Sequence, residues 1–485
     1  MPKTARGEAA IVTKTAISKD APPTPASAER TLSGWGRTSP SAARVVTPDD
    51  VTGVLASALL AAGPGDGSLK PGVIARGLGR SYGDAAQCAG GIVVDTQNLG
   101  RIGAIDPESG EVEVDAGVSL DALLRAGLES GWFIPVSPGT RQVTIGGAIA
   151  ADIHGKNHHA DGSFCSHVTS VTLDTPRGGH EVGPDADPEL FWATAGGMGL
   201  TGIITRARVS MRKVETSWMR VDTERHTGID SLMDGLVRVD GVNRYSVAWV
   251  DCAATGSRLG RGILDAGDHA TAAELPAKRA ADPLAPPRRR GLKVPNLVPP
   301  RIMNALTVSA FNEAWFRKGI SRTSQIRHLG GFFHPLDAVA NWNLLYGRRG
   351  FVQYQFVVGD EHRAVIPQAI EMLQKAGAPC TLAVLKRFGP GDPGPLSFPI
   401  AGWTLALDLP VGPAGLRPAL RRLDDIVAGA GGRVYLAKDA RLEPEMFSVM
   451  YPRLGEFQAV RRRVDPEGLL QSDLGRRVGI CEHAP

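Results

Sequence analysis

The sequence predicts an α+β protein of two domains. Its 485 residues are too many for one small hydrophobic core, so a second domain is expected. In the first half, a glycine-rich loop at 77–84 joins two short strands, whereas a dinucleotide-binding fold would place a helix directly after it. In the second half, segments at 245–250, 352–356, 382–388 and 403–408 have strand periodicity, with helical patterns between them. They predict a domain built on an antiparallel sheet with flanking helices.

The composition narrows the classes of partner. The formal net charge is +4 and charged residues make up 21%, which suits anionic ligands or membrane surfaces and does not call for nucleic acid. Five scattered cysteines form no C-x-x-C pair, so neither a disulfide framework nor a metal site is predicted. No apolar run reaches spanning length and the N-terminus lacks a secretory pattern. We therefore expect a cytoplasmic or peripherally membrane-associated protein.

Changes in composition indicate the domain boundaries. Residues 1–30 contain almost no large apolar side chains, which predicts a disordered tail. The first domain is then expected at 31–215 and the second at 216–432, with 433–485 returning to the first. A helix should follow Asp50, because apolar residues then recur at helical spacing.

The first glycine motif follows a predicted strand at 73–76 and precedes another at 92–95. Its residues, Gly77–Asp84, would bind phosphate through backbone N–H groups. The alternative is a simple glycine turn.

The stretch Pro138–His159 is the centre of the predicted site. A strand at 112–116 and a helix capped by Ser119 lead into it. Small residues dominate from Gly146 to Ala151, so a ligand can approach the backbone, and four titratable side chains follow within six positions. The alternative is a tight turn followed by a solvated polar loop.

A third glycine run covers Gly196–Ile204. A helix capped by Asp187, with Pro188 at its first position, precedes the run, and a strand follows it. The run is expected to approach a ligand closely, with a glycine-permitted bend as the alternative.

Together these motifs resemble the flavin-binding domain of the vanillyl-alcohol-oxidase superfamily. The resemblance rests on A-R-G-L-G-R-S-Y-G-D at 75–84, D-A-G-V-S-L at 115–120 and P-G-T-x-x-V-T-I-G-G-A-I-A-x-D-I-H-G-K at 138–156. It implies a two-subdomain PCMH-type domain that binds FAD. The cofactor-binding residues implied are Ala75, Arg76, Gly77, Leu78, Gly79, Arg80, Ser81, Tyr82, Gly83, Asp84, Ala85, Gly139, Thr144, Ile145, Gly146, Gly147, Ala151, Asp152, Ile153, His154, Ile204 and Tyr435.

The resemblance also bears on how FAD is held. Members that attach FAD covalently through the first loop place a histidine just before the serine, and here Arg80 precedes Ser81. We therefore expect non-covalent FAD.

A Pro- and Arg-rich stretch interrupts the second domain. It includes Pro286–Arg290 and predicts a mobile loop at about 265–325. Its arginines lie either in a solvated loop or in a lid that meets an anionic or membrane-borne substrate.

Three later strands carry candidate substrate-binding residues. Alternation places Gln353 and Gln355 on one face of their strand, where two amides suit a polyhydroxylated ligand. Lys386 shares a side with Leu382, Val384 and Phe388, where an ammonium group requires an anionic partner, either a ligand or Asp408. Thr404 and Ala406 share the polar face of the last strand. Each strand taken alone also fits an ordinary amphipathic sheet.

The chain then returns to the first domain. A helix with Leu416, Leu420 and Leu423 on one face is followed by an expected strand at 434–439. By resemblance, Tyr435 and Lys438 within it reach the flavin. The closing R-x-x-x-D-P segment at 461–466 resembles the family's last contact with the FAD domain.

Four further segments narrow the resemblance to the branch of the superfamily that acts on polyprenyl-phosphoryl sugars. They are D-I-H-G-K-N-H-H, K-R-F-G-P-G, L-S-F-P-I-x-G-W and A-K-D-x-R. The resemblance implies oxidation of a ribose 2′-hydroxyl, with an NADH-dependent reductase as partner and the cell-envelope side of the membrane as another possible location. The alternatives are an aldonolactone or alditol oxidase of the same superfamily and a non-catalytic FAD-binding scaffold.

Roles follow for individual residues of the site. Lys438 and His154 are the catalytic candidates. Lys438 is assigned to proton handling or charge stabilisation, and His154 to holding sugar hydroxyls or the flavin edge. Relatives carry a cysteine at the position of Ala406, so thiol chemistry is excluded there while oxidation is unaffected. The substrate-binding candidates are Ser246, Gln353, Gln355, Lys386, Phe388, Thr404 and Ala406.

Overall fold

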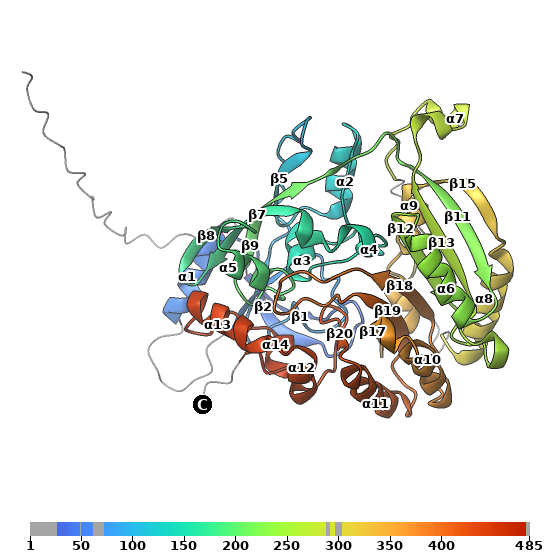
Figure 1. Ribbon diagram of the computed structural model, residues 1–485. Coiled ribbons are helices and arrows are strands. Elements are labelled where there is room, and N and C mark those ends of the chain that lie inside the picture. Colours follow the sequence, from blue (N-terminus) through green and yellow to red (C-terminus); the bar gives the residue numbers. More distant parts are fainter. Residues whose placement is uncertain (1–26, 49, 62–71, 288–291, 296–302, 482–485) are drawn as a thin grey trace, which may run out of the picture.

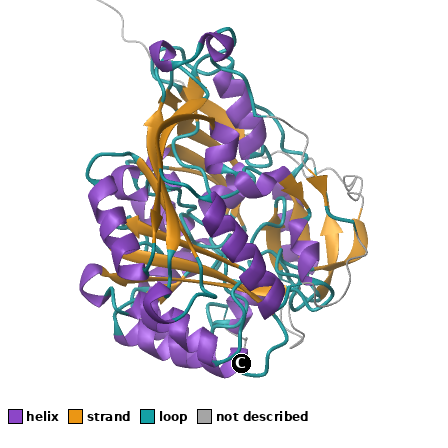
Figure 2. Ribbon diagram, turned by 90° about the vertical axis from the view of Figure 1, so that its right-hand side faces the viewer, coloured by secondary structure: helices purple, strands orange, loops and turns teal. Residues whose placement is uncertain are grey.

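The computed structural model describes residues 27–48, 50–61, 72–287, 292–295 and 303–481. Three larger sheets organise this part of the chain, and helices lie around the outside of the strands (Figures 1 and 2). The α+β prediction is confirmed. Most of the predicted N-terminal tail lies outside the described residues, but its last positions belong to a strand.

The first sheet contains the strand–loop–strand unit predicted around the first glycine motif. Its order is β1 (Ser27–Leu32), β2 (Ser41–Val46), β4 (Ile92–Asp95) and β3 (Val73–Arg76). The last three strands are parallel, and β1 runs antiparallel at the edge. Helix α1 (Val51–Ala61) packs its apolar side chains on this sheet with Leu469 and Leu470 from the end of the chain.

The second sheet is antiparallel and supports the central glycine-rich stretch. Its order is β5 (Glu111–Asp115), β9 (Ile203–Ser210), β7 (Val168–Thr175) and β8 (Gly178–Val182). The helices of this part are α2 (Leu120–Leu128), α3 (Ile145–Ala150), α4 (His158–Asp161) and α5 (Pro188–Thr194). The predicted caps Ser119 and Asp187 accept backbone N–H groups at the starts of α2 and α5.

The third sheet has eight antiparallel strands. Their order is β15 (Arg322–His328), β11 (Trp218–His226), β13 (Gly262–His269), β12 (Tyr245–Val250), β18 (Leu382–Phe388), β19 (Gly402–Pro410), β17 (Phe351–Gly359) and β20 (Arg433–Val434). One face carries the amphipathic helices α6 (Ile229–Asp240), α10 (Val365–Lys375) and α11 (Leu416–Gly429). The other face turns towards the glycine-rich stretch (Figure 1).

Smaller elements complete the described chain. Two short pairs are β6 (Trp132–Phe133) with β10 (Arg212–Lys213) and β14 (Leu292–Lys293) with β16 (Val339–Ala340). The remaining helices are α7 (Ala277–Ala280), α8 (Ala305–Lys318), α9 (Leu329–Phe333), α12 (Pro444–Met450), α13 (Leu454–Val464) and α14 (Asp473–Arg477). Among the described residues no helix is long and apolar enough to cross a membrane.

Two sequence-based expectations were wrong in detail. The stretch 265–325 is not one loop, because β13 runs to His269 and Asn304 caps the 14-residue helix α8; Arg288–Arg290 lie outside the described residues. The strand expected at 434–439 ends at Val434, because the chain then turns and Lys438 N donates to Tyr435 O. The turn aims the side chain of Lys438 into the site described next.

Candidate active site

A cavity of about 560 Å³ lies between the glycine-rich segments and one face of the eight-stranded sheet. The first domain contributes the loop after β3, the segment around α3 and the bend before β9. The sheet contributes residues of β17, β18 and β19, and the turn after β20 closes the cavity. The three glycine motifs predicted from the sequence therefore line one space.

At one end the cavity walls are mainly backbone. Gly77, Gly79, Gly146, Gly147, Gly199 and Gly202 line it. Gly79 has a φ of 62°, which other residues rarely adopt, and a Cβ on Gly77 would lie 2.2 Å from Thr144 Oγ1. Thr144 caps α3 by accepting the N–H of Gly147 at 3.2 Å. The first and second glycine segments thus pack too closely for side chains between them.

At the other end polar side chains of the sheet face the cavity. Gln353, Gln355, Lys386 and Ala406 line it as alternation predicted, and Lys438 joins them from the turn. In the register of β17 and β19, Gln355 stands opposite Ala406 and Gln353 opposite Asp408. This end therefore offers amides and amines to a ligand.

His154 lies where the two ends meet. Its Nε2 is 2.8 Å from Gln355 Nε2, and its Nδ1 has no partner in the part of the chain that the structure describes. The rings of Phe388 and Tyr435 pack against it at 4.8 and 5.0 Å between centroids. Burial, with smaller effects of Lys386 and His158, holds the pKa of His154 well below its usual value. Because the Gln355 amide nitrogen donates to Nε2, the neutral ring carries its proton on Nδ1 and can donate it in a hydrogen bond.

The other titratable groups of the predicted cluster point elsewhere. Lys156 Nζ donates to Phe332 O at 2.6 Å, and His158 Nδ1 accepts Gly389 N at 3.2 Å. His159 contacts Asn243 O at 3.0 Å. Of this cluster, only His154 lines the cavity formed by the described residues.

Two lysines of the cavity lack a carboxylate partner. Lys386 Nζ has one weak hydrogen bond, to Gly155 O at 3.4 Å, and Lys438 Nζ lies 3.8 Å from the centre of the Tyr82 ring. Neither makes an ion pair with another described residue. Burial lowers the pKa of Lys386 to about 7, helped by Lys156 and Lys438, and lowers the pKa of Lys438 to about 8, opposed by Asp408. The alternative to a ligand, an ion pair of Lys386 with Asp408, is not formed.

Most predicted cofactor residues line the cavity, but several do not. Asp84 instead forms an ion pair with Arg477 at 2.8 Å, and Arg76 donates to two backbone carbonyls at 2.9 Å each. Asp152 Oδ1 accepts Cys165 N at 3.1 Å. Gly83 packs on Asp439, and Ile145 lies in the core. These five residues support the walls of the cavity from behind.

Three predicted substrate residues are also outside the lining. Ser246 Oγ donates to Asp240, away from the cavity. Thr404 Oγ1 accepts Gln355 Nε2 at 3.2 Å, and Phe388 packs on the ring of His154. Thr404 and Phe388 therefore position lining residues instead of lining the cavity themselves.

Sequence reasoning missed a further wall of the cavity. Residues from Leu336 to Trp342 line it, and Asp337 fastens this segment by accepting Thr140 Oγ1 at 2.6 Å and Arg141 N at 2.9 Å. Trp35, with Arg80 over its ring at 4.3 Å, was also missed. No local pattern marks these residues, because tertiary packing alone brings them to the site.

Comparison with known proteins agrees with this geometry. Residues 42–182 match the FAD binding domain family, and residues 416–478 match a family described as D-arabinono-1,4-lactone oxidase. The chain is 44% identical over 458 residues to the decaprenylphosphoryl-beta-D-ribose oxidase of Mycolicibacterium smegmatis, across 93% of this chain and 97% of that protein. It is 38% identical over 373 residues to an uncharacterized protein of Streptomyces coelicolor, across 75% of this chain and 100% of that one. Cytokinin dehydrogenase 4 of Arabidopsis thaliana is 30% identical over 161 residues, 31% of this chain and 30% of that enzyme.

These matches confirm FAD as the cofactor, the PCMH-type fold and the assignment to the FAD-dependent oxidoreductases. The residues present fit the cofactor. Walls formed by backbone suit phosphates, and the volume lies in the range of cofactor sites. The segments that would hold FAD are Gly77–Tyr82, Thr144–Gly147 and Gly199–Ile204, with Tyr435 near the sheet.

Proposed function

Because the chain belongs to the family of decaprenylphosphoryl-β-D-ribose oxidases, we propose that it oxidises the 2′-hydroxyl of a polyprenyl-phosphoryl ribose to a ketone. This reaction is the first half of an epimerisation that gives an arabinose donor for cell-wall arabinan. The observation that carries the proposal is Lys386, a cavity lysine without a carboxylate partner among the described residues, on the same face as two amides.

Different residues of the cavity have different roles in this reaction. Bound FAD would supply the acceptor for the hydride of the carbinol carbon. Lys386 offers its ammonium to the phosphate of the substrate, and Gln353 and Gln355 offer amides to the sugar hydroxyls. Lys438 is placed to receive or hold the proton of the 2′-hydroxyl, since burial lowers its pKa to about 8. His154, held neutral by burial, can hydrogen-bond the sugar or the flavin.

We propose that FAD is held without a covalent bond. Arg80 occupies the position before Ser81, and no cysteine is among the described residues that line the cavity. Acid precipitation should therefore release all the flavin into the supernatant. Flavin that remains on the washed pellet would contradict non-covalent binding.

The substrate is tested with purified holoenzyme under anaerobic conditions. We expect polyprenyl-phosphoryl ribose to bleach the visible absorbance of the flavin, and free aldonolactones or alditols to leave it unchanged. The opposite result would favour the aldonolactone or alditol oxidase that the match at 416–478 also allows. No bleaching by either class would favour a non-catalytic scaffold. Re-oxidation by air compared with a quinone-like dye then identifies the electron acceptor.

A separate NADH-dependent reductase is proposed to complete the inversion, because the ketone must be reduced from the opposite face. Mixing the two proteins with substrate and NADH should give polyprenyl-phosphoryl arabinose. Either protein alone should not.

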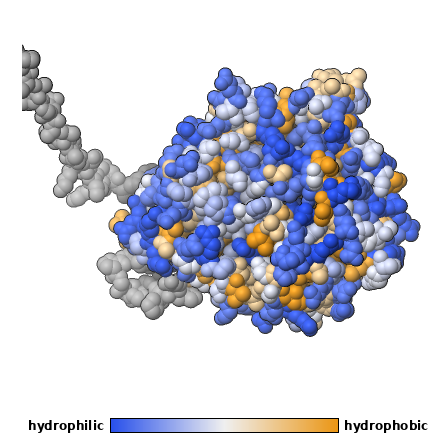
Figure 3. Space-filling model, viewed as in Figure 1, coloured by the Kyte–Doolittle hydropathy of each residue, from blue (hydrophilic) through white to orange (hydrophobic). Residues whose placement is uncertain are grey.

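We also propose that the protein contacts the membrane that carries its substrate. Leu306, Phe311 and Trp315 of α8 are 79%, 59% and 43% exposed, and the last two rings stack at 6.0 Å. On the face shown in Figure 3, hydrophobic residues form several separate groups among hydrophilic ones. Aromatic side chains beside basic Lys318 suit the interface of an anionic bilayer.

This contact is tested by sedimentation with anionic phospholipid vesicles. The double variant Phe311→Ser and Trp315→Ser should lose binding. Val242→Ser is the matched control, since Val242 is 77% exposed after α6. Equal binding of all three proteins would contradict the role of α8.

A further inference from the structure

Asp408 of β19 is a buried carboxylate next to the cavity that none of the roles above uses. It is 1% exposed and alternates with Thr404 and Ala406, so it lies on the cavity face of the sheet. Ala406 lines the cavity, whereas Asp408 lies behind the residues that do. Burying a carboxylate is costly unless other groups compensate its charge.

Few groups compensate the charge of the Asp408 carboxylate. Its Oδ1 accepts Gln353 Nε2, and its Oδ2 has no hydrogen-bond partner in the described chain. No arginine, lysine or histidine described here lies within ion-pair distance of it. One neutral amide thus holds a buried carboxylate, and that amide belongs to a residue that lines the cavity.

Lys438 lines the same cavity as Gln353, the residue that holds Asp408. It approaches from the turn after β20, over the ring of Tyr82. Lys438 favours the charged form of Asp408, and Asp408 favours the charged form of Lys438. Burial nevertheless raises the pKa of Asp408 to about 7. The other titratable groups that face the pair are Tyr82, Tyr346, Cys380, Lys386 and His154.

We propose that Asp408 is a positioning residue that acts through Lys438 and Gln353. Its negative charge offsets part of the effect of burial on Lys438, so that the amine can gain and lose a proton near neutral pH. Its bond to Gln353 Nε2 leaves the amide oxygen of Gln353 as the acceptor for a hydroxyl of the ligand. The inference rests on the proposed function, since Lys438 and Gln353 act on substrate there.

The alternative role for Asp408 is a structural one. Asp424 provides the comparison, because it is also buried and accepts Tyr354 OH, whose side chain lies on the opposite face of β17. Arg441 pairs with Asp424 directly, so its charge is compensated by the fold itself. Removing either carboxylate would alter stability, but only Asp408 should alter the protonation of Lys438.

The test uses the holoenzymes of wild type, Asp408→Asn and Asp424→Asn. Competitive acetylation over a pH series, read on the Lys438 peptide by mass spectrometry, reports the fraction of neutral amine. Because loss of a neighbouring opposite charge moves a pKa by about 1–3 units, we expect the midpoint in Asp408→Asn to fall by about one unit or more. Asp424→Asn should keep the wild-type midpoint. The pH profile of flavin reduction by polyprenyl-phosphoryl ribose should shift in the same direction.

Each outcome decides one claim. An unchanged Lys438 midpoint in Asp408→Asn would overturn the role of Asp408, whatever happens to stability. Restoration of the midpoint in Asp408→Glu would support it, and Asp408→Ser is the second neutral variant should Asn not fold. Failure of the wild type to oxidise the lipid-linked ribose would overturn the proposed function instead, and the acetylation result would still decide the charge coupling.

Discussion

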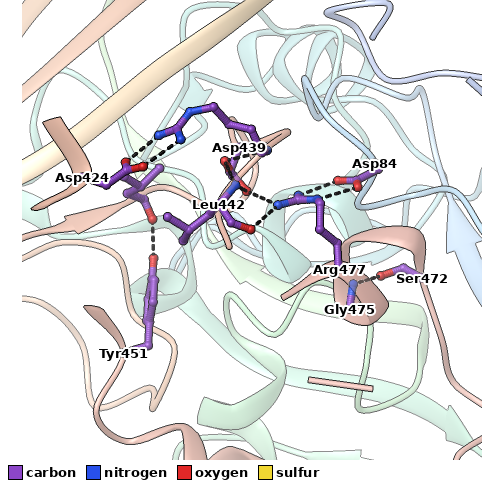
Figure 4. A network of polar contacts seen from close by, with 10 residues as sticks. Asp84, Asp424, Asp439, Leu442, Tyr451, Ser472, Gly475 and Arg477 are labelled. Carbon is purple, nitrogen blue, oxygen red and sulfur yellow. Dashed lines mark hydrogen bonds and ion pairs between the residues drawn. The ribbon is translucent and has the colours of Figure 1, made fainter. Parts of the chain in front are cut away.

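Two clusters of buried charge in the protein are built in opposite ways. In the first cluster, Arg477 binds Asp84 and Asp439 at 2.8 Å, and Arg441 binds Asp424 (Figure 4). The backbone N–H of Leu442 also donates to Asp439. At the cavity, Lys386, Lys438 and Asp408 have no such ion-pair partners in the described chain.

The difference separates structural charge from functional charge. The cluster in Figure 4 joins residues far apart in the chain, so its ion pairs fasten the C-terminal segment to the first glycine loop. Charged groups left unpaired in a cavity destabilise the folded state. They are retained where a ligand supplies the partner. Substitutions that disrupt one cluster at a time can test this difference.

The largest effect is expected from Lys438→Met. Positioned proton-transfer groups contribute about 10²–10⁴-fold to rate, so turnover should fall by that range. FAD should remain bound, because the glycine segments that line the other end of the cavity would hold it. Flavin content and substrate-dependent bleaching are measured on one preparation. Normal turnover would assign the proton to another group, and loss of flavin would make Lys438 structural.

Arg477→Met is the corresponding substitution in the ion-pair cluster of Figure 4. It leaves Asp84 and Asp439 buried without their cation, and breaking a buried pair costs about 3–5 kcal/mol. Denaturant unfolding measures the loss. Arg463→Met is the control, since Arg463 pairs with Asp187 at 2.9 Å on the surface and should cost no more than about 1 kcal/mol. An equal loss of unfolding free energy in the two variants would contradict a structural role for this cluster.

The sequence predicted local elements well because short-range patterns encode them. Helix caps at Ser119 and Asp187 and the alternation of β17, β18 and β19 depend on neighbouring residues only. Alternation was therefore enough to identify Gln353, Gln355 and Lys386 as residues of one face. The strand expected at 434–439 was wrong because the backbone turn that ends it has no strong local signature.

The site was predicted less completely because many of its contacts are long-range. Asp84 belongs to a family motif, yet its partner Arg477 lies 393 positions away, and nothing local distinguishes that bond from a contact with FAD. The Leu336–Trp342 wall and the isolation of Asp408 likewise arise from tertiary packing. The resemblance to the flavoprotein family identified candidate site residues, and the structure shows which of these residues face the cavity.

Lys386→Met tests the assignment of the phosphate. A charge-assisted hydrogen bond contributes about 1.5–3 kcal/mol, so the KM for lipid-linked ribose should rise roughly ten- to a hundredfold. The melting temperature should not fall, because the variant removes an unpaired half-buried ammonium group. An unchanged KM with a large drop in melting temperature would make Lys386 structural and remove the best support for a phosphorylated substrate.

The smallest expected effect is a pH dependence of stability that Lys386 confers. Its pKa is about 7 in the folded protein and about 10.4 in an unfolded chain, so between these values the unfolded state binds a proton that the native state lacks. The free energy of unfolding should therefore rise from pH 7 to pH 10, and the cost of the buried charge is complete below pH 7. We expect about 1 kcal/mol, less than the full shift implies, because solvent in the cavity screens the group. Denaturant titrations at several pH values should show a shallower rise in Lys386→Met than in the wild type. If the free energy of unfolding depends on pH in the same way in both proteins, Lys386 has an ordinary pKa and does not require an anionic ligand.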